Sequence, residues 1–415
     1  MLKNYFKTAI KVLWRHKLFT FISLFGISFT LLILIVIASF VDHTFGPVTP
    51  EKKLDRTLSV TMSILRSKSG GMAAGPLFSP YFLKRYVKSL KTPELVSLSS
   101  FHNPIITYKN NRKFNFALKF VDGEFWQILD FEFIEGRGFS TEDVEMRNPV
   151  AVISRETRDK YFEGESALGK TIEADGQNFR VIGIVENVSL LRIMPYSDIW
   201  VPLTYTKDDL NKICIMGGFP GWYAMILARD KSDLPIIQRE FNKHLQEVEF
   251  PEGRWVSVNT GANTYAEAIT RSLFRQEGDT KSPLLIFIFV LMFLFMLLPT
   301  VNLVNINISR ILERSSEIGV RKAFGASSMT LIWQFITENV IITLIGGAIS
   351  LFLAILVLMV INDSGMIPHL HLTLNYRVFM VSLVICLCFG LLSGVYPAYK
   401  MSRLNPVDAL RGGQQ

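Results

Sequence analysis

The chain has 415 residues, 49% of them hydrophobic, and its 44 lysines and arginines exceed its 36 aspartates and glutamates by eight. A positive net charge is common in nucleic-acid-binding proteins, but here segment 42–281 holds 31 basic and 31 acidic residues, and the excess charge lies beside apolar runs. This distribution argues against nucleic-acid binding and indicates a membrane protein. Segment 42–281 contains one cysteine, Cys214, which excludes an internal disulfide there.

Four apolar runs are each long enough to cross a membrane. Three have no charged residue, and the run 327–362 has only Glu338. A helix rises about 1.5 Å per residue, so about 20 residues cross a hydrocarbon core of about 30 Å. The sequence therefore predicts an integral membrane α-helical protein with four transmembrane helices, at residues 18–41, 282–309, 329–362 and 378–399.

Residues 1–17 precede the first apolar run and are strongly basic. Basic residues recur every four positions from Lys3 to Arg15, with apolar residues on the other side, which predicts an amphipathic helix at the inner membrane surface. A basic topology signal with no further role is the alternative. The apolar run that follows is too long for a typical signal peptide, and no A-x-A-like site follows it, so we expect an uncleaved anchor.

Positive charge also predicts the orientation. The excess of lysine and arginine lies in three segments, 1–17, 310–328 and 400–415, and the positive-inside rule assigns all three to the cytoplasm. Segment 42–281 and the short loop 363–377 then lie outside, and both termini lie inside. Four spans with both ends on one side is a self-consistent arrangement.

The external segment is predicted to be a large α+β domain of two lobes. One α+β lobe comprises residues 42–100 and 201–281, and a β-rich insert comprises residues 101–200. The two stretches differ in pattern, because helical and strand periods alternate in the first, whereas short apolar strands separated by glycines fill the second.

Within the α+β lobe, the alternation from Leu58 to Ile64 predicts one half-buried strand. Ser79-Pro80 opens a helix as its cap and first residue. The lobe is completed by strands at 223–228 and 255–258 and a helix over 236–248.

Within the insert, alternating apolar residues from Phe114 to Phe120 follow the turn-like Asn110-Asn111, which predicts a hairpin. Further strands are predicted at 150–153 and 179–185.

Several residues within the spans are candidates for a hinge or for helix packing. Pro299 removes a backbone donor and predicts a kink, which is either a hinge or a static bend. Glu338 is costly inside a membrane, and because no span has a second ionisable residue we expect structural hydrogen bonding, not a proton relay. Small residues allow close helix contact. They occur at Gly346-Gly347 and, as a weak signal for a dimer face, at Gly390 and Gly394.

Two local patterns suggest chemistry that their surroundings do not support. Residues 164–171 match the phosphate-binding pattern G-x-x-x-x-G-K-[ST], but such a loop follows a buried strand and opens a helix, whereas we expect a helix before it and strands after it. His369 and His371 lie in the short outer loop, where two subunits could share a metal, but we expect loop surface. The residues indicate no catalytic, cofactor or metal site in this chain.

The cytoplasmic loop carries the most specific pattern. Residues 313–326 read Glu-Arg-Ser-Ser-Glu-Ile-Gly-Val-Arg-Lys-Ala-Phe-Gly-Ala, which closely resembles the E-R-x-x-E-I-G-x-R-x-A-x-G-A loop of MacB/FtsX-type ABC transporter permeases. The ending over 394–411 resembles the G-x-x-P-A…P-x-x-A-L-R ending of that class. External stretches at 136–139, 150–153, 168–172 and 181–185 resemble the MacB-type periplasmic core domain, so the resemblance covers essentially the whole chain.

The resemblance implies a half-size permease of the bacterial inner membrane, itself non-catalytic and without a cofactor of its own. In this class two permease subunits pair, as identical copies or as related chains, and separate ABC ATPase subunits hold ATP and magnesium beneath them. ATP-driven closure of the ATPases moves the helices, and the motion reaches the periplasmic domains, which is called mechanotransmission. A periplasmic adaptor or carrier protein and the membrane lipid complete the expected partners.

The loop over 310–328 is the predicted contact with the ATPase. A charged helix at the membrane surface can sit in a groove of a soluble partner, and Glu317 and Arg321 stabilise such a helix at i,i+4 spacing, which Gly325 can end. An ordinary solvated loop is the alternative that charge alone favours. The resemblance carries over these coupling residues: Glu313, Arg314, Glu317, Ile318, Gly319, Arg321, Lys322, Phe324 and Gly325.

Three functions fit such a permease. The first is export or efflux of a compound or peptide, the second is release of lipoproteins to a carrier, and the third is FtsX-like signalling that controls a cell-wall hydrolase. The large, two-lobed external segment favours the MacB-like form over the smaller FtsX domain. A membrane-anchored sensor is disfavoured because the chain has no cytoplasmic kinase or DNA-binding domain.

Overall fold

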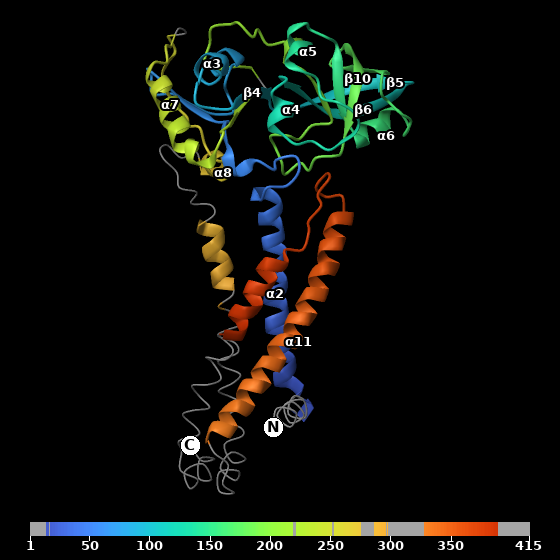
Figure 1. The fold of residues 1–415 in the computed structure, drawn as a ribbon, viewed down its shortest axis with the longest axis vertical. Coiled ribbons are helices and arrows are strands. Elements are labelled where there is room, and N and C mark those ends of the chain that lie inside the picture. The colour runs from blue at the N-terminus through green and yellow to red at the C-terminus, as the bar shows by residue number, and fades with distance from the viewer. Residues whose placement is uncertain are drawn as a thin grey trace. The chain divides into compact units, whose positions relative to one another are not determined.

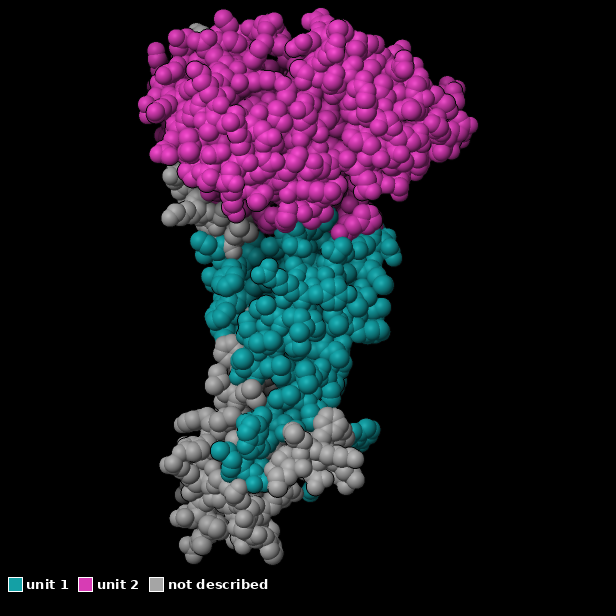
Figure 2. Space-filling view, in the orientation of Figure 1, with its two compact units in different colours: residues 1–43, 286–364, 372–415 teal, residues 44–285, 365–371 magenta. Residues whose placement is uncertain are grey.

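A computed structural model describes residues 14–15, 17–218, 221–250, 253–274, 286–295, 297 and 328–388. The chain forms two compact units, coloured separately in Figure 2. We call residues 1–43, 286–364 and 372–415 the helical unit, and residues 44–285 and 365–371 the sheet unit. The loop 365–371 thus belongs to the sheet unit although it connects two helices of the helical unit.

The helical unit contains the apolar helices. Helix α2 (Lys17–Phe45) and helix α11 (Ser328–Asp363) are the two described helices that are long and apolar enough to cross a membrane, α11 over Ile336–Asp363. Two shorter apolar helices, Ile286–Phe295 and Tyr376–Cys388, overlap the second and fourth predicted spans. All four predicted spans therefore contain helix in their described residues.

Close contact between α2 and α11 depends on glycine. A Cβ atom at Gly346 would lie 2.8 Å from the Ile27 side chain, and the Ser28 hydroxyl donates to the Gly346 carbonyl at 3.1 Å. A Cβ atom at Gly347 would lie 2.7 Å from Leu383, in the helix Tyr376–Cys388. The prediction that these two glycines allow close helix packing is confirmed.

The sheet unit is built on a ten-stranded mixed sheet (Figure 1). Its main path runs β1 (Thr57–Val60), β12 (Trp222–Leu227), β4 (Leu95–Ser100), β6 (Arg112–Val121), β11 (Ile199–Pro202), β8 (Val150–Ser154), β10 (Gln177–Val185) and β7 (Phe133–Gly136). Strand β5 (Asn103–Lys109) pairs with β6, and β9 (Thr171–Ala174) pairs with β10. The pairs β6–β11 and β8–β10 are parallel, and the other pairs are antiparallel.

A smaller sheet and short helices complete this unit. The three-stranded sheet has the order β13 (Trp255–Asn259), β2 (Ser63–Ser67), β3 (Met72–Gly75). The α-helices are α3 (Pro80–Tyr86), α4 (Phe125–Ile128), α5 (Thr141–Glu145), α6 (Arg155–Tyr161), α7 (Leu234–Gln246) and α8 (Tyr265–Phe274). Single 3-10 turns occur at Leu54–Arg56, Leu203–Tyr205 and Lys231–Asp233.

Both faces of the large sheet are buried. In β12, Trp222, Ala224 and Ile226 belong to one hydrophobic cluster, which also contains Phe82 of α3. The alternate residues Tyr223, Met225 and Leu227 belong to a second cluster, with Phe125 of α4. Successive side chains of a strand point to opposite faces, so this central strand contributes to two cores, and full burial of such a side chain is worth about 1.5–3 kcal/mol.

The predicted strand from Leu58 to Ile64 is wrong in one respect. It is two strands in different sheets, because β1 pairs with β12 in the large sheet whereas β2 pairs with β3 and β13 in the small one. All four residues of β1 are buried, so the strand is also not half-exposed. Alternation of apolar residues continues across the break, and for this reason the sequence pattern does not reveal it.

Other local predictions are confirmed. Ser79 caps α3, with its hydroxyl accepting from the Phe82 N–H at 3.1 Å. The hairpin β5–β6 turns at Asn110 and Asn111, both with positive φ. The predicted lobe and insert meet at the pairing of β4 with β6, so their strands belong to one continuous sheet.

The phosphate-loop lookalike also has the local structure that the sequence predicts. Helix α6 precedes Gly164, and strand β9 begins at Thr171, so no helix opens after this loop. Without a helix N-terminus, the loop lacks the dipole and free N–H groups that bind phosphate.

Candidate functional site

Most of the predicted coupling and hinge residues lie outside the described residues. This applies to all nine loop residues from Glu313 to Gly325, to Pro299, and to Gly390 and Gly394. Glu338 is described, in α11, where 2% of its surface is exposed. Its expected role in structural hydrogen bonding stays a prediction.

The chain enters the sheet unit from α2 through a segment held by a buried arginine. Arg192 Nη1 lies 2.9 Å from Glu51 Oε2, and both side chains are 2% exposed. Arg192 Nη2 also donates to the Gly46 carbonyl at 2.6 Å. One guanidinium therefore fixes both ends of segment 46–51. We call Glu51, Arg192 and their contacts the entry clamp.

A buried lysine lies behind this clamp. Lys119, on β6, has no exposed surface, and its ammonium donates to the carbonyls of Ile193 (3.1 Å) and Met194. Burial lowers the pKa of Lys119 to about 7, and Glu51 acts against that change. Burial likewise raises the pKa of the Glu51 carboxyl, and the Arg192 guanidinium counteracts the rise. Charged groups that are shielded from water are stabilised chiefly by one another. Lys119, Glu51 and Arg192 therefore depend on each other, and the loss of one would leave an uncompensated buried charge.

Aromatic hydroxyls tie the same region together. Tyr223 donates to the Met194 carbonyl at 2.5 Å, and Tyr265 donates to the Leu191 carbonyl at 3.1 Å. The ring of Tyr265, in α8, also packs edge-on against Phe45 at the end of α2, with centroids 6.1 Å apart. The segment from Leu191 to Met194 is thus held from several elements at once.

Among the described residues, the loop 365–371 also connects the sheet unit to helices of the helical unit. His369 Nε2 lies 2.7 Å from Glu156 Oε2, the Leu190 N–H donates to the Pro368 carbonyl at 3.3 Å, and Leu370 is 3% exposed. The prediction that His369 is loop surface is wrong, because only 15% of its side chain is exposed. His371, in contrast, is exposed as expected.

Two carboxylates face this histidine. Ligand atoms of Glu156, Asp198 and His369 all lie within 4.8 Å of one another. Burial raises the pKa of the Asp198 carboxyl, which the Ala117 N–H partly counteracts, and the neighbouring Glu156 raises it further. The pKa of Glu156 is lowered overall, since Lys160 and His369 outweigh the effect of its partial burial.

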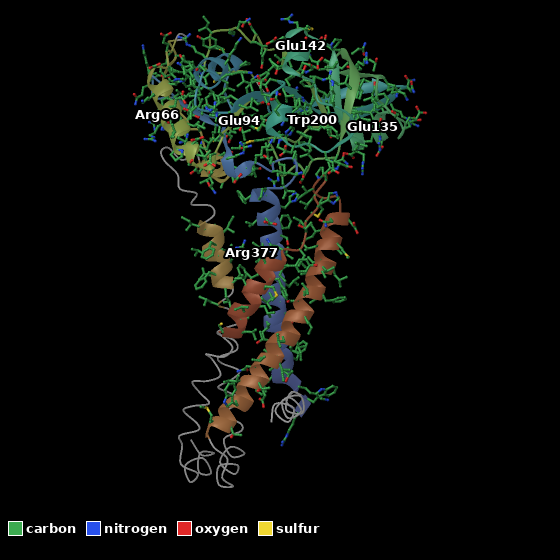
Figure 3. All side chains as sticks on the ribbon, viewed as in Figure 1. Arg66, Glu94, Glu135, Glu142, Trp200 and Arg377 are labelled. Carbon is green, nitrogen blue, oxygen red and sulfur yellow. The ribbon has the colours of Figure 1, made fainter. Side chains whose placement is uncertain are left out.

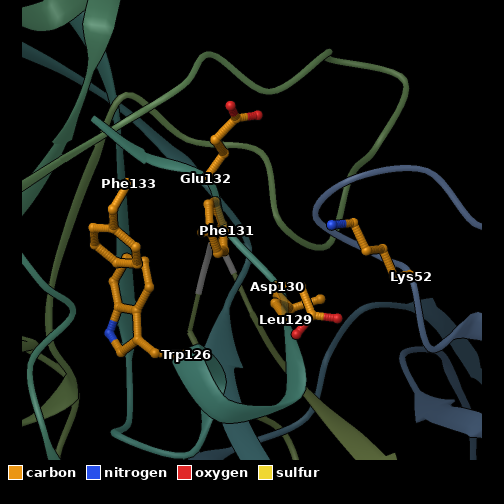
Figure 4. Close-up of a pocket in the computed structure, with 7 residues that line it drawn as sticks. All are labelled: Lys52, Trp126, Leu129, Asp130, Phe131, Glu132 and Phe133. Carbon is orange, nitrogen blue, oxygen red and sulfur yellow. The ribbon is translucent and has the colours of Figure 1, made fainter. Parts of the chain in front are cut away.

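Two cavities of the sheet unit are large enough for small ligands. One, of about 550 Å³, is lined by Trp126, Phe131 and Phe133 on one side, with Lys52 lying across from them (Figure 4). The other, of about 540 Å³, is mainly apolar and is lined by residues that include Met62, Leu191 and Ile269. Neither brings together groups arranged for catalysis. Figure 3 shows the side chains of the described residues, among them Trp200, which is fully buried in the sheet unit.

Sequence reasoning missed both connections. Arg192 lies in a stretch without periodicity, and its partners Gly46 and Glu51 are more than 140 positions away. His369 was noticed, but its partner Glu156 is an ordinary helix-surface residue by pattern. In each case the residue type was a signal. An arginine among apolar residues and a histidine in a short loop both indicate a polar partner, but the sequence does not identify which residue that partner is.

Comparison with known protein families identifies the chain. Residues 20–244 match the family model of the MacB-like periplasmic core domain, and residues 289–406 match the FtsX-like permease C-terminal region. The first match covers more than half of the 415 residues. The chain belongs to the MacB/FtsX family of ABC transporter permeases. Residues 44–244 of the sheet unit lie within the match to the MacB-like periplasmic core domain, so this permease has a large periplasmic α+β domain that resembles the MacB core.

Curated relatives are similar over nearly all of the permease. The uncharacterized ABC transporter permease YvrN of Bacillus subtilis is 22% identical, covering 98% of this chain and 99% of that protein. The macrolide export ATP-binding/permease protein MacB of Haemophilus ducreyi is 24% identical over 98% of this chain. The permease spans about half the length of this MacB relative, 55%.

A solved structure is also similar. The periplasmic region of MacB from Actinobacillus actinomycetemcomitans is 17% identical, with a TM-score of 0.37, and covers 54% of this chain and 94% of that one.

Proposed function

We propose that this permease couples ATP hydrolysis by a separate ABC ATPase to a conformational change of its periplasmic domain, and thereby exports a compound or peptide. It crosses the bacterial inner membrane four times, at residues 18–41, 282–309, 329–362 and 378–399, with both termini in the cytoplasm. The cytoplasmic loop 310–328 contacts the ATPase, and ATP and magnesium bind to that partner. Two permease subunits, identical or related, form the membrane part.

The proposal is supported by the contacts that hold two connecting segments, 46–51 and 365–371, within the sheet unit next to apolar helices in the chain. The segment after α2 is fixed by Arg192, and the loop after α11 is fixed by His369 and by the buried Leu370. Removing one partner of a buried ion pair costs about 3–5 kcal/mol, so we expect the pair Glu51–Arg192 to keep segment 46–51 attached to the rest of the sheet unit. Helix movement is then passed to the periplasmic domain and is not lost in a flexible linker.

The alternatives differ in what the periplasmic domain does with this movement. Release of lipoproteins to a carrier and control of a cell-wall hydrolase both use the same coupling. A periplasmic adaptor supports export, whereas a carrier or a hydrolase as partner supports the second or the third function.

The coupling role is tested by co-expression of the permease with candidate ABC ATPases and reconstitution into liposomes. The wild-type permease should bring down an ATPase that carries the only affinity tag and should stimulate its ATP turnover. Glu317→Arg and Gly325→Trp should abolish that stimulation while membrane insertion stays intact. The matched control is Glu247→Arg, a charge reversal at an exposed position at the end of α7, which should leave stimulation unchanged.

Two results would contradict the proposal. Full stimulation in both loop variants would remove the cytoplasmic loop from the coupling path. Equal loss in Glu247→Arg would show that charge reversal anywhere impairs the assay, so the loop would have no special role.

A further inference from the structure

The cluster of Glu156, Asp198 and His369 brings three separate parts of the chain to one point. Glu156 lies in the first turn of α6, Asp198 lies just before β11, and His369 lies in the loop 365–371. Their ligand atoms are within 4.8 Å of one another. Such a convergence of one imidazole and two carboxylates is a donor set that proteins use for transition metals.

The two carboxylates are oriented by neighbours that leave other oxygen atoms available. Asp198 Oδ2 accepts from the Ala117 N–H at 2.7 Å, and within the described part of the chain the other carboxylate oxygen makes no hydrogen bond. Glu156 Oε1 is held by Lys160 Nζ at 2.5 Å, which leaves Oε2 beside His369 Nε2 at 2.7 Å. Outer contacts of this kind fix first-shell ligands of metal sites.

Charge at the cluster favours a cation. Glu156 and Asp198 together carry two negative charges, and Lys160 is the one cation within ion-pair distance of either among the described residues. With a neutral imidazole, the two carboxylates and Lys160 leave a net charge of −1 on a partly buried cluster. A divalent ion would neutralise it and would use the same imidazole nitrogen that now contacts Glu156.

We propose that Glu156, Asp198 and His369 bind one divalent transition-metal ion, and that the ion fastens the loop 365–371 to the periplasmic domain. Zinc suits this set best, because it takes nitrogen and carboxylate ligands at about 2.0–2.2 Å and in catalytic-type sites uses three protein ligands with water in the remaining position. Donors of a tetrahedral site lie about 3.4 Å apart. The Glu156–His369 pair, now 2.7 Å apart, would therefore open by about 0.7 Å, and the other pairs, now within 4.8 Å, would close by about 1.4 Å at most. Calcium and magnesium, which prefer oxygen ligands alone, fit less well.

The bound ion has a mechanical consequence that is separate from ATPase coupling. The loop 365–371 connects α11 to the helix Tyr376–Cys388. Metal ligation by Glu156 of α6 and by Asp198, which precedes β11, would tie this connection to the large sheet. The loop would then be held by coordination bonds in addition to the His369–Glu156 contact and the burial of Leu370.

Metal binding to the purified full chain tests this proposal without the ATPase. The chain, in detergent and without a histidine tag, is stripped with a chelator and titrated with zinc alone, and bound zinc is measured by calorimetry and by elemental analysis after gel filtration. We expect one zinc per chain. His369→Ala and Asp198→Asn should weaken binding at least tenfold, which corresponds to about 1.4 kcal/mol, and manganese should bind more weakly than zinc.

The same loop supplies a matched control. His371→Ala removes an exposed histidine two positions away and should leave zinc binding unchanged. His369→Cys, a conservative ligand change, should retain the site and give a thiolate-to-metal charge-transfer band when cobalt replaces zinc. Wild-type protein that holds no stoichiometric zinc, or equal binding by His369→Ala and wild type, would overturn the proposal, as would a His369→Cys variant that is folded by tryptophan fluorescence but lacks the band.

Discussion

Replacing Arg192 with methionine should destabilise the periplasmic domain more than any ordinary surface change. Methionine has a similar length but no charge, so the Glu51 carboxylate, 2% exposed, loses the guanidinium 2.9 Å away. Breaking a buried ion pair by removing one partner costs about 3–5 kcal/mol. The Gly46 carbonyl also loses its 2.6 Å hydrogen bond from Arg192, which adds about 1 kcal/mol.

The assay is urea unfolding of the full chain in detergent at pH 7, followed by tryptophan fluorescence. Trp200 and Trp222 are buried in the sheet unit, so their emission reports on it. Arg112→Met is the matched control, because its partner Glu163 is 3.5 Å away and both side chains are more than 70% exposed. Exposed ion pairs contribute little, and this control should unfold like the wild type.

A double variant separates charge from packing. Glu51→Gln in the Arg192→Met background removes the uncompensated carboxylate and should restore part of the lost stability, as a double-mutant cycle for directly interacting groups requires. The loss in Arg192→Met alone should also shrink at low pH, because burial already raises the pKa of Glu51 and a protonated carboxyl leaves no unpaired charge. A loss under about 1 kcal/mol, or a double variant no more stable than the single one, would refute this reasoning.

Three further predictions concern Lys119, Gly136 and Gly346. The pKa of Lys119 falls from 10.5 to about 7 in the folded chain, so the unfolded state binds more protons between these pH values, and the free energy of unfolding should rise with pH there by up to about 1.4 kcal/mol per pH unit. In unfolding measured at several pH values, Lys119→Met should flatten this slope. An unchanged slope would contradict the lowered pKa of Lys119. Gly136→Ala should destabilise the fold strongly, since Gly136 has a φ of +73° and a Cβ atom there would lie 2.1 Å from the Ile182 carbonyl oxygen. Gly164→Ala is the control, because Gly164 has a similar φ of +80° but open space around it, and it should cost about 1 kcal/mol. Equal losses of stability in urea unfolding would count against the clash at Gly136. Gly346→Leu should lower the thermal stability of the helical unit, because a Cβ atom at this position would lie 2.8 Å from Ile27. Leu344→Ala, at an exposed position of α11, is the control and should leave the melting temperature unchanged. Equal melting temperatures of the two variants in detergent would show that α2 and α11 do not pack at Gly346.

Local structure was predictable wherever short-range chemistry determines it. Ser79 before Pro80 predicts the start of α3, and Asn110-Asn111 predicts the β5–β6 hairpin, because caps and tight turns depend on a few adjacent residues. The apolar runs likewise predict α2 and α11, since span length follows from membrane thickness.

Long-range pairing was not predictable. Nothing in residues 58–64 shows that β1 joins β12 while β2 joins β13, because strand partners lie far apart in the chain and alternation is the same in both. Lys119 illustrates the same limit. It alternates with apolar residues along β6, so the pattern predicts an exposed side chain, yet the side chain is fully buried. The entry clamp and the cluster at His369 both consist of such distant contacts.

The predicted coupling site depends on sequence and family membership, since residues 313–325 lie outside the described part of the chain. Its strongest support is the match of residues 289–406 to the FtsX-like permease region. Among the described residues, the structure contributes the contacts at segment 46–51 and at loop 365–371, through which we propose that helix movement enters the periplasmic domain.

Hydrogen–deuterium exchange on the permease–ATPase complex tests this transmission most directly. Exchange is measured in the ADP state and in an ATP state trapped with vanadate, for the wild type and for Glu317→Arg. We expect an ATP-dependent change in the exchange of segment 46–51 and loop 365–371 of the wild type that is absent in Glu317→Arg. An ATPase that turns over while both segments exchange identically in the two nucleotide states would contradict it.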